Sequence, residues 1–443
     1  MLDKVVNSIM NNLSDEMTLQ ILTKDYPENF FVMATAAEKL SIRAIVEACI
    51  RGESGKVLER TYGSPNVQSQ WNKLFLNGRQ LFNMPTEKLD NISTEVAIGK
   101  NCVKPLVLSI PVMITGMSYG GSLSLKAKLA LAKGASLVGT ATNTGESGVC
   151  KEEREAASIL IGQYNRGGWL RSKEDLEKLD AIEIQMGQGA WGGAVPTRIP
   201  SNEIGEHLRN TWSLQKGEDA EKGSRMEGIN SPEDLVKLVS NLKNQYGIPV
   251  GIKIAASHFI EKELDIITST EADFIVIDGA EGGTSSAPPT LEDDMGIPTL
   301  FALNRTANYL QQKGVKDKYD LIITGGLKTP GEFLKALALG AKAVYIGSIA
   351  VIATIQSQII KTITYESTPQ LVLYEGNLKE ELDVDKGAKT LSNFLTSCKE
   401  EMKLALSAMG KTNIDQLTKE DLVCVDKELS AVLNIGYAGD PCN

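Results

Sequence analysis

The sequence is poor in the residues that build metal centres, membrane spans and basic surfaces. Its six cysteines are scattered, without a CxxC pair, and it has two histidines, His207 and His258. Since zinc and iron–sulfur sites need thiolates at short, fixed spacings, we expect no metal site and reduced, structural thiols. No apolar run approaches the roughly 20 residues that cross a bilayer. A formal net charge of −10 argues against nucleic acid or an anionic membrane as a partner.

Short apolar segments alternate with helical patterns from about residue 105 onward. This alternation predicts parallel strands joined by helical crossovers. Eight such units predict an α/β fold of the (β/α)₈ TIM-barrel type, with the active site at the carboxyl ends of the strands. A doubly wound open sheet is the alternative, because periodicity does not show closure. The predicted strands are 112–115, 137–140, 159–163, 182–186, 250–254, 274–278, 321–324 and 343–346.

The flanks of this region differ from it in pattern. Residues 1–104 show mostly helical periodicity, which predicts a helical N-terminal region packed on a barrel of residues 105–410. Residues 411–443 form a C-terminal tail, and the residues just before this tail have a helical pattern. The first residues, MLDKVVNSIMNNLSDEM, are amphipathic and acidic, unlike a signal peptide, so we expect a cytoplasmic protein. The polar segment 196–231 follows the fourth predicted strand, and such long loops are lids, binding loops or surface excursions.

Glycines follow six of the predicted strands at equivalent positions. A row of glycines at one end of the strands exposes backbone on one face of the barrel, which favours a ligand held by backbone groups. These glycines are Gly116, Gly120 and Gly121; Gly145 and Gly148; Gly187 and Gly189; Gly279, Gly282 and Gly283; Gly325 and Gly326; and Gly347.

Two features of the sequence, a pair of loops after the last strands and a lysine within an apolar strand, together indicate a flavin. The segment 323–348, ITGGLKTPGEFLKALALGAKAVYIGS, contains the loops after the last two strands, which in barrels commonly hold a phosphate at a helix start. Lys253 lies inside the apolar strand GIKIA, and a buried lysine is costly unless it is paired. Its partner is either a structural carboxylate or a delocalised anion such as a reduced flavin ring. The combination with the phosphate loops favours flavin mononucleotide (FMN).

Several motifs in order resemble the FMN-binding domain of the glutamate synthase family. GMSYGGSLS (116–124) is similar to that family's GMSYGALS, and NTGESG (143–148) to its NTGEGG. IKIA with Lys253, DGAEGGT (278–284) and GGLKTPGE (325–332) follow in the family's order. The match covers roughly residues 80–360, and one block alone would be weak evidence.

The resemblance implies roles for individual residues. Lys253 and Glu146 would be catalytic, with Lys253 stabilising anionic reduced flavin and Glu146 lying over the ring near the substrate. Substrate contacts would come from Glu146, Gln188, Trp191 and Glu281. The residues implied at the cofactor are Gly116, Met117, Ser118, Asn143, Gln185, Lys253, Gly279, Gly283, Gly325, Gly326, Gly347 and Ser348.

The resemblance implies an FMN-dependent oxidoreductase that transfers a hydride between flavin N5 and a small imine, carbonyl or amine. The departures limit this expectation. The sequence begins Met-Leu, without the family's glutaminase domain, and the cysteines that bind an iron–sulfur cluster after the eighth strand are missing. In QMGQGAWGG (185–193), Gln188 replaces the lysine of the family's oxo-acid site and Trp191 replaces an acid, so we expect a substrate other than 2-oxoglutarate.

Two alternatives remain at this point: a non-redox FMN-dependent isomerase or lyase on the same barrel, and a flavin-binding subunit without turnover. A 2-hydroxyacid oxidase is disfavoured, because that family needs a histidine after strand six and DGAEGGT has none. Trp169 and Trp212 are further candidates for the pocket wall. We expect a small-molecule substrate and a homo-oligomer, and an electron-donor protein is compatible with these features.

Overall fold

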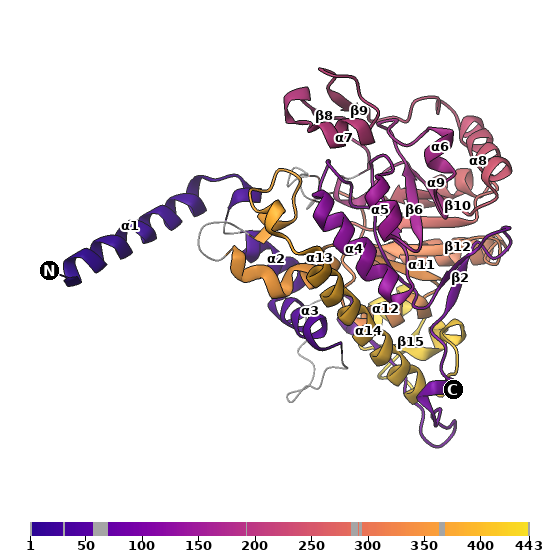
Figure 1. Cartoon of the computed structure of the whole chain (residues 1–443). Helices are drawn as coiled ribbons and strands as arrows, with labels where there is room; N and C mark the ends of the chain where they lie inside the picture. Colours follow the sequence, from indigo (N-terminus) through magenta and orange to yellow (C-terminus); the bar gives the residue numbers. More distant parts are fainter. Residues whose placement is uncertain are drawn as a thin grey trace.

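The computed structural model describes residues 2–29, 32–55, 70–191, 193–284, 291, 295–362 and 368–441. Its centre is an eight-stranded parallel sheet in which each strand lies beside the next along the chain (Figure 1). The strands, in chain order, are β4 (Val112–Ile114), β5 (Thr142–Asn143), β6 (Leu160–Tyr164), β7 (Ala181–Gln185), β10 (Val250–Ala255), β11 (Phe274–Asp278), β12 (Asp320–Thr324) and β13 (Ala343–Ile346).

The sheet closes into a barrel. β13 pairs in parallel with β4, with Tyr345 opposite Met113. At the remaining seam, between β4 and β5, the Ile114 amide donates to the carbonyl of Ala141 at 2.9 Å. The prediction of a barrel over an open sheet is therefore confirmed.

One predicted strand was misplaced. Residues 137–140 do not form a strand, because helix α4 (Leu125–Val138) runs through Val138 and ends at Gly139 in the left-handed conformation, with φ 73°. The second barrel strand, β5, begins at Thr142, two residues after the predicted segment ends, and contains only polar residues. Apolar, β-branched residues at the end of a buried helix imitate a short strand.

Helices cover the outside of the barrel, and several begin at local signals in the sequence. Ser231 caps α8 with a reciprocal bond to Asp234, with Pro232 in the first turn. The Thr329 side chain caps α12 by accepting the Glu332 amide, and Pro330 follows it. Serine and threonine caps satisfy free amides and proline presets the first turn. The outer helices, besides α4, include α5 (Lys151–Ala156), α6 (Lys173–Leu176), α8 (Pro232–Tyr246), α9 (Ile260–Ile267), α11 (Thr299–Gln312), α12 (Pro330–Ala338) and α13 (Ser348–Ile355).

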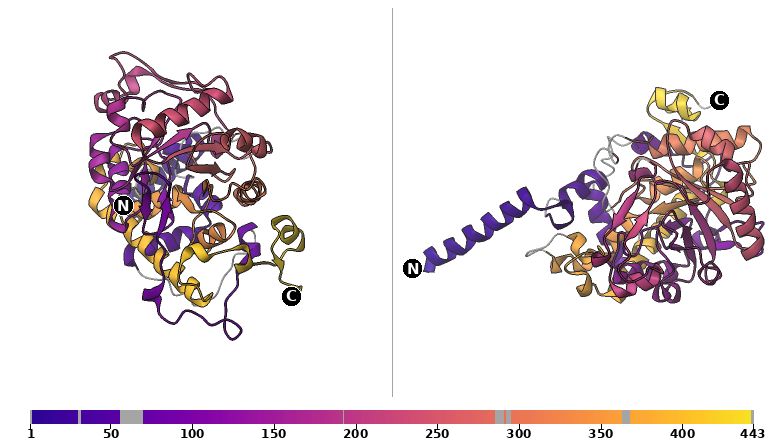
Figure 2. Two further views of the ribbon diagram at one scale, coloured as in Figure 1. Left: turned by 90° about the vertical axis from the view of Figure 1, so that its right-hand side faces the viewer. Right: turned by 90° about the horizontal axis from the view of Figure 1, so that it is seen from above.

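The N-terminal helices and a long C-terminal helix pack together on one side of the barrel. α3 (Ile42–Ser54) lies against α14 (Val384–Ala408), where the Arg51 guanidinium binds Glu401 at 2.5 Å with Arg51 almost fully buried. α2 (Val32–Leu40) precedes α3, whereas α1 (Leu2–Thr23) projects away from the body (Figure 2). Among the described residues, no helix combines the length and apolarity that a membrane span requires.

In residues 70–104, short strands and single 3₁₀ turns replace the predicted helices. β1 (Leu74–Leu76) pairs with β14 (Leu422–Cys424), which also pairs with β15 (Gly436–Tyr437). β2 (Val96–Ile98) and β3 (Leu106–Leu108) form a hairpin at the amino ends of the barrel strands, where the Gly99 amide donates to Asp320 at 2.7 Å. α15 (Lys427–Leu433) completes the C-terminal segment. Residues before and after the barrel therefore share one small sheet.

The polar segment after β7 folds into a compact excursion at the top of Figure 1, containing β8 (Thr197–Ile199), α7 (Glu206–Thr211) and β9 (Ala220–Lys222). It has its own small core, in which the indole rings of Trp169 and Trp212 stack 3.9 Å apart. The two tryptophans are thus structural residues that fix the excursion to the barrel rim.

Candidate active site

The carboxyl ends of the barrel strands bring the predicted site residues to one face, where barrel active sites lie. Met117 and Ser118 lie in the loop after β4, Asn143 ends β5, and Gln185 ends β7. Lys253 lies in β10 as the register partner of Gln185, so the two side chains leave the sheet on the same side. The remaining predicted residues follow β4, β5, β7, β11, β12 and β13: Gly116, Glu146, Gln188, Trp191, Gly279, Glu281, Gly283, Gly325, Gly326, Gly347 and Ser348.

Lys253 is a buried, paired cation. Its side chain is 3% exposed, and its Nζ lies 3.1 Å from the Asp278 carboxylate at the end of the neighbouring strand. Burial alone would lower the pKa of the ammonium, but the charges of Asp278 and Glu183 outweigh burial and raise that pKa above its usual value. Lys253 is therefore a permanent positive charge at the carboxyl end of the barrel.

Glu183 organises the polar interior beneath this cation. The carboxylate is fully buried in β7 and accepts bonds from Gln163 at 2.6 Å, Tyr345 at 3.0 Å and the Asn143 amide at 3.3 Å. Burial, followed by the Glu183 charge, raises the pKa of Tyr345 well above its ordinary value, so this phenol is a stable donor. The network fixes Asn143, whose Oδ1 in turn accepts the Gly145 amide at 2.9 Å.

Glu146, after β5, is held between two cations. Its Oε2 lies 2.5 Å from the Nζ of Lys222, which comes from β9 of the excursion, and its Oε1 lies 3.4 Å from the guanidinium of Arg166, after β6. All three side chains are at least nine-tenths shielded from solvent. Two cations against one carboxylate leave this group with one net positive charge. The excursion thus contributes a side chain to the site.

Two glycines allow the first loops to pack closely. A Cβ at Gly145, which has φ +67°, would lie 2.4 Å from the Ser118 amide nitrogen. A Cβ at Gly116 would lie 2.5 Å from the Gln163 side-chain nitrogen. Only glycine fits either position, because backbone and buried side chains occupy the space. Met117 and Ser118 are consequently held against the Asn143–Glu146 loop.

The predicted phosphate residues converge at the ends of β11 and β13. A Cβ at Gly283 would lie 2.9 Å from Ser348 Oγ and 3.7 Å from the Nζ of Lys39. Lys39, at the end of α2, donates to the Gly282 carbonyl at 2.9 Å. Ser348 is exposed and opens α13, and amides at a helix start favour an anion. An ammonium from the N-terminal region therefore lies beside the predicted phosphate site.

Other predicted residues are engaged with protein groups. Glu281 accepts both the amide and the hydroxyl of Thr299 at 2.6 Å, so its carboxylate fixes the start of α11. Gln188 accepts the Gln185 side-chain amide at 3.3 Å, and the Trp191 amide donates to the Gln188 carbonyl at 3.2 Å. The substrate roles predicted for Glu281, Gln188 and Trp191 remain predictions.

The face fits a bound cofactor. Four buried polar atoms here have no hydrogen-bond partner among the described residues: Thr115 Oγ1, Asn165 Oδ1, Arg166 Nε and Gln185 Oε1. Unpaired buried polar atoms are rare and need a ligand or water. The donors and acceptors around Gln185 and Lys253 would bind the ring of FMN, and the loops after β11 and β13 would bind its phosphate. The polar groups of the protein therefore match the ring and the phosphate of this cofactor.

The closed parallel barrel and its loop-borne polar site place the chain in the class of (β/α)₈ enzymes. Within that class, the chain belongs to the glutamate synthase family: a family model described as the conserved region in glutamate synthase matches residues 60–412. The resemblance inferred from the motifs is confirmed.

Several curated relatives support the family assignment. The chain is similar to the archaeal-type glutamate synthase [NADPH] of Thermotoga neapolitana, with 35% identity over 325 residues, which are 73% of this chain and 64% of that protein. It is also similar to the archaeal glutamate synthase [NADPH] of Methanocaldococcus jannaschii, with 34% identity over 81% of this chain and 71% of that protein. A glutamate synthase large subunit-like protein of Rhizobium meliloti is 29% identical over 86% of this chain and 90% of its own length. The chain thus spans just under two thirds of the Thermotoga neapolitana protein.

Solved structures share the fold at low sequence identity. A flavocytochrome b2 with sulfite bound has a TM-score of 0.52 and 15% identity, covering 84% of this chain and 83% of that chain. A lactate oxidase of Pediococcus acidilactici has a TM-score of 0.51 and 14% identity, covering 88% and 94%. At this level of identity, the similarities show a shared fold.

The sequence did not point to Arg166, Lys222, Glu183, Tyr345 or Lys39. Each reaches the site through long-range folding, and none lies in a block that matches the family's motifs. A weak signal was present for two of them: Glu183 is an acid within the apolar strand IEIQM, and Tyr345 is a phenol within AVYI. A polar group inside a buried strand needs a partner, so both side chains could have been expected to form hydrogen bonds in the barrel interior.

Proposed function

We propose that the chain is an FMN-dependent oxidoreductase of the glutamate synthase type that acts on a small amine, imine or carbonyl substrate. The observation that carries this proposal is the buried cation Lys253, placed by strand register beside Gln185, whose Oε1 is unpaired. FMN, when bound, supplies reversible two-electron transfer. The family assignment and the fold support this cofactor and this class of reaction.

The chain's own residues hold and orient the reactants. Lys253 places a positive charge where electron density accumulates, and Asp278 holds its ammonium in position. Asn143, at the end of β5, is fixed by bonds of its side-chain amide to Glu183 and Tyr345. Lys39, Gly283 and Ser348 hold the phosphate end.

Glu146 is the candidate for proton transfer to or from the substrate nitrogen or oxygen. Lys222 and Arg166 fix its carboxylate, and the net positive charge of the three groups favours a substrate with one carboxylate. The replacements at Gln188 and Trp191 remove the cation that would hold a second carboxylate. We therefore propose a one-carboxylate amino or oxo acid, or a small amine, in preference to 2-oxoglutarate.

The reductive reaction tests this proposal. The FMN-loaded protein is mixed anaerobically with one-carboxylate amino acids, small amines and glutamate, and flavin absorbance is followed. We expect bleaching by a member of the first two groups, and slower or no bleaching by glutamate. Glu146→Gln should keep FMN but bleach at least about 100-fold more slowly, the scale of one acid–base group. Glu155→Gln, at an exposed site in the following helix, is the matched control.

Other outcomes would select the alternatives. Substrate conversion without net bleaching would indicate a non-redox isomerase or lyase. Flavin binding with no response to any donor or acceptor would indicate a subunit without turnover. The names of the relatives include NADPH, so NADPH is the first electron donor to test.

An oligomer and an electron-donor protein remain predictions. The projecting helix α1 carries exposed Met10, Leu13 and Met17, which form an apolar stripe at helical spacing. Sedimentation of the chain with and without residues 1–29 would show whether α1 takes part in assembly.

A further inference from the structure

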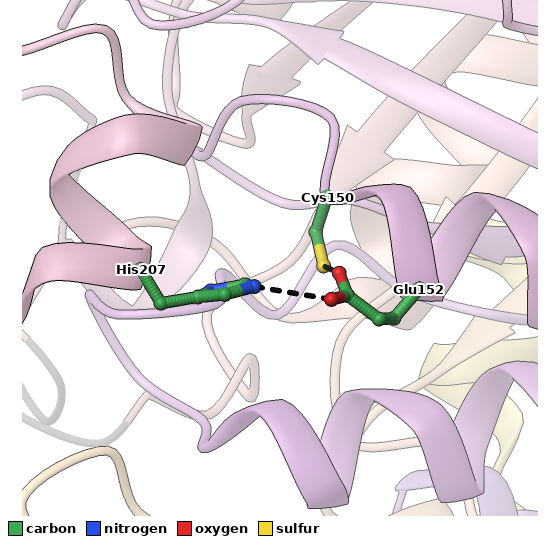
Figure 3. A group of neighbouring side chains, drawn as sticks. All are labelled: Cys150, Glu152 and His207. Atoms are coloured by element: carbon green, nitrogen blue, oxygen red, sulfur yellow. Dashed lines mark hydrogen bonds and ion pairs between the residues drawn. The ribbon is translucent and has the colours of Figure 1, made fainter.

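Three potential metal ligands from two distant segments meet beside the active face (Figure 3). Cys150 and Glu152 lie at the start of α5, and His207 lies in α7 of the excursion. The Cys150 thiol lies 2.9 Å from Glu152 Oε2, and His207 Nε2 lies 3.3 Å from Glu152 Oε1. One ligand atom from each residue falls within 4.8 Å of the other two.

This ligand set suits a borderline or soft divalent metal ion. Thiolate, imidazole and carboxylate are the groups that bind Zn²⁺, with bond lengths of about 2.0–2.3 Å. Tetrahedral geometry at those lengths separates the ligand atoms by about 3.4–3.6 Å. The two hydrogen-bonded separations, 2.9 and 3.3 Å, are slightly shorter than this value, and the three ligand atoms lie within 4.8 Å of one another, so small side-chain rotations would complete the site. Three protein ligands would leave one position for water.

Tyr119 orients the imidazole for metal binding. Its hydroxyl lies 2.9 Å from His207 Nδ1, and the phenol is 5% exposed. When Nδ1–H donates to this oxygen, the Nε2 lone pair faces Glu152 and Cys150. A partner of this kind on the second ring nitrogen is the usual support of a metal-bound histidine.

The remaining properties of the cluster are compatible with metal exchange. The thiol is buried, whereas the Glu152 and His207 side chains are 44% and 46% exposed, so an ion has access from solvent. The metal-free thiol donates its proton to Glu152 in the 2.9 Å hydrogen bond. A bound ion would displace that proton to solvent and take its place between sulfur and carboxylate.

We propose that Cys150, Glu152 and His207 form a binding site for a zinc-class divalent ion that ties the excursion to the barrel rim. The excursion also carries Lys222, which binds Glu146 four residues before Cys150 in the sequence. The ion would therefore hold in place the segment that positions Glu146. The prediction of no metal site rested on spacing in the sequence, and Glu152 and His207 are 55 residues apart.

Cobalt and zinc titrations of tag-free, reduced, chelator-treated protein test this proposal. We expect one equivalent of Co²⁺ to bind with a thiolate-to-cobalt charge-transfer band, read as a difference spectrum against the zinc form. Cys150→Ser should abolish the band, and His207→Asn should weaken binding at least about 100-fold. Tyr119→Phe should weaken it about 10–100-fold, the scale of an outer-shell partner. His258→Asn and Cys49→Ser are the matched controls and should bind as the wild type does.

Limited proteolysis supplies a second readout that does not depend on the flavin. Zinc should slow cleavage within residues 196–231 in the wild type and in His258→Asn, but not in His207→Asn. Absence of one-equivalent binding, or binding unchanged in Cys150→Ser and His207→Asn, would overturn the proposal. These results are separate from the proposed redox function, which the flavin absorbance reports.

Discussion

Lys253→Met removes the cation on which the proposed function depends, and its effect on stability follows from burial. The Lys253 and Asp278 side chains are 3% and 9% exposed, with a nitrogen–oxygen distance of 3.1 Å. An exposed pair would contribute about 0–1 kcal/mol. Removing one partner of a buried pair leaves an uncompensated charge and costs about 3–5 kcal/mol. We therefore expect the cofactor-free variant to lose about 3–5 kcal/mol in urea unfolding.

A double variant separates the structural effect of Lys253 from its effect on the flavin. Lys253→Met with Asp278→Asn removes both charges, and replacing a whole buried pair is often nearly neutral. We expect stability to recover while the flavin midpoint potential stays lowered by about 30 mV for each tenfold loss of affinity for the reduced form. Recovery of the potential together with stability would refute the assignment of Lys253 to the cofactor.

The pH dependence checks the same pair. The pKa of Lys253 is raised above its ordinary value of 10.5 in the folded protein. The contribution of the ammonium to stability is therefore complete below pH 10.5 and is lost as the pH rises through the higher folded value. The stability difference between wild type and Lys253→Met should be constant at neutral pH and shrink only in strong alkali. A difference that vanishes near neutrality would contradict the raised pKa.

Three further predictions concern other parts of the site. Lys222→Met should retain FMN but lower kcat/KM about 30-fold or more in steady-state assays, because Glu146 loses a buried charge partner worth about 2–5 kcal/mol. Lys39→Met should weaken FMN binding about 10- to 150-fold in fluorescence titrations, since one charge-assisted bond near the phosphate contributes about 1.5–3 kcal/mol. Tyr345→Phe should cost about 1–3 kcal/mol in urea unfolding, because Glu183 loses a buried donor.

A control substitution and the results that would contradict each prediction are as follows. Lys216→Met, at an exposed position in the same excursion as Lys222, should leave turnover unchanged. Unaltered turnover in Lys222→Met would show that the excursion does not act on Glu146. Unaltered FMN affinity in Lys39→Met would remove α2 from the phosphate site, and wild-type stability in Tyr345→Phe would show that Glu183 is satisfied without the phenol.

The barrel could be predicted because its core strands are short apolar runs at regular spacing, each followed by a helix. The second strand could not, because Thr142 and Asn143 are polar and the preceding apolar residues belong to α4. Residues 70–104 also differed from the prediction, since β1 is stabilised by pairing with β14, more than 300 residues further along the chain.

The site residues likewise divide into those that the sequence identified and those that it did not. Lys253 and Glu146 stood out because one interrupts an apolar strand and the other lies in a family motif. Arg166 and Lys222 did not, because the ion pairs that define them form only when the excursion folds over the rim. The sequence likewise did not predict that His207 lies close to Cys150, because the two residues are far apart in the chain. They come together only when the small core of the excursion packs.

The oxidative half-reaction is the decisive test of the proposed flavin chemistry. The FMN-loaded protein is reduced anaerobically by light and mixed in a stopped-flow instrument with one-carboxylate oxo acids, with and without ammonia, and with 2-oxoglutarate. We predict rapid return of the flavin absorbance with a one-carboxylate acceptor, slower return with 2-oxoglutarate, and slow return with every acceptor in Glu146→Gln. A protein that takes up no FMN, or whose reduced flavin no acceptor reoxidises, would contradict this prediction.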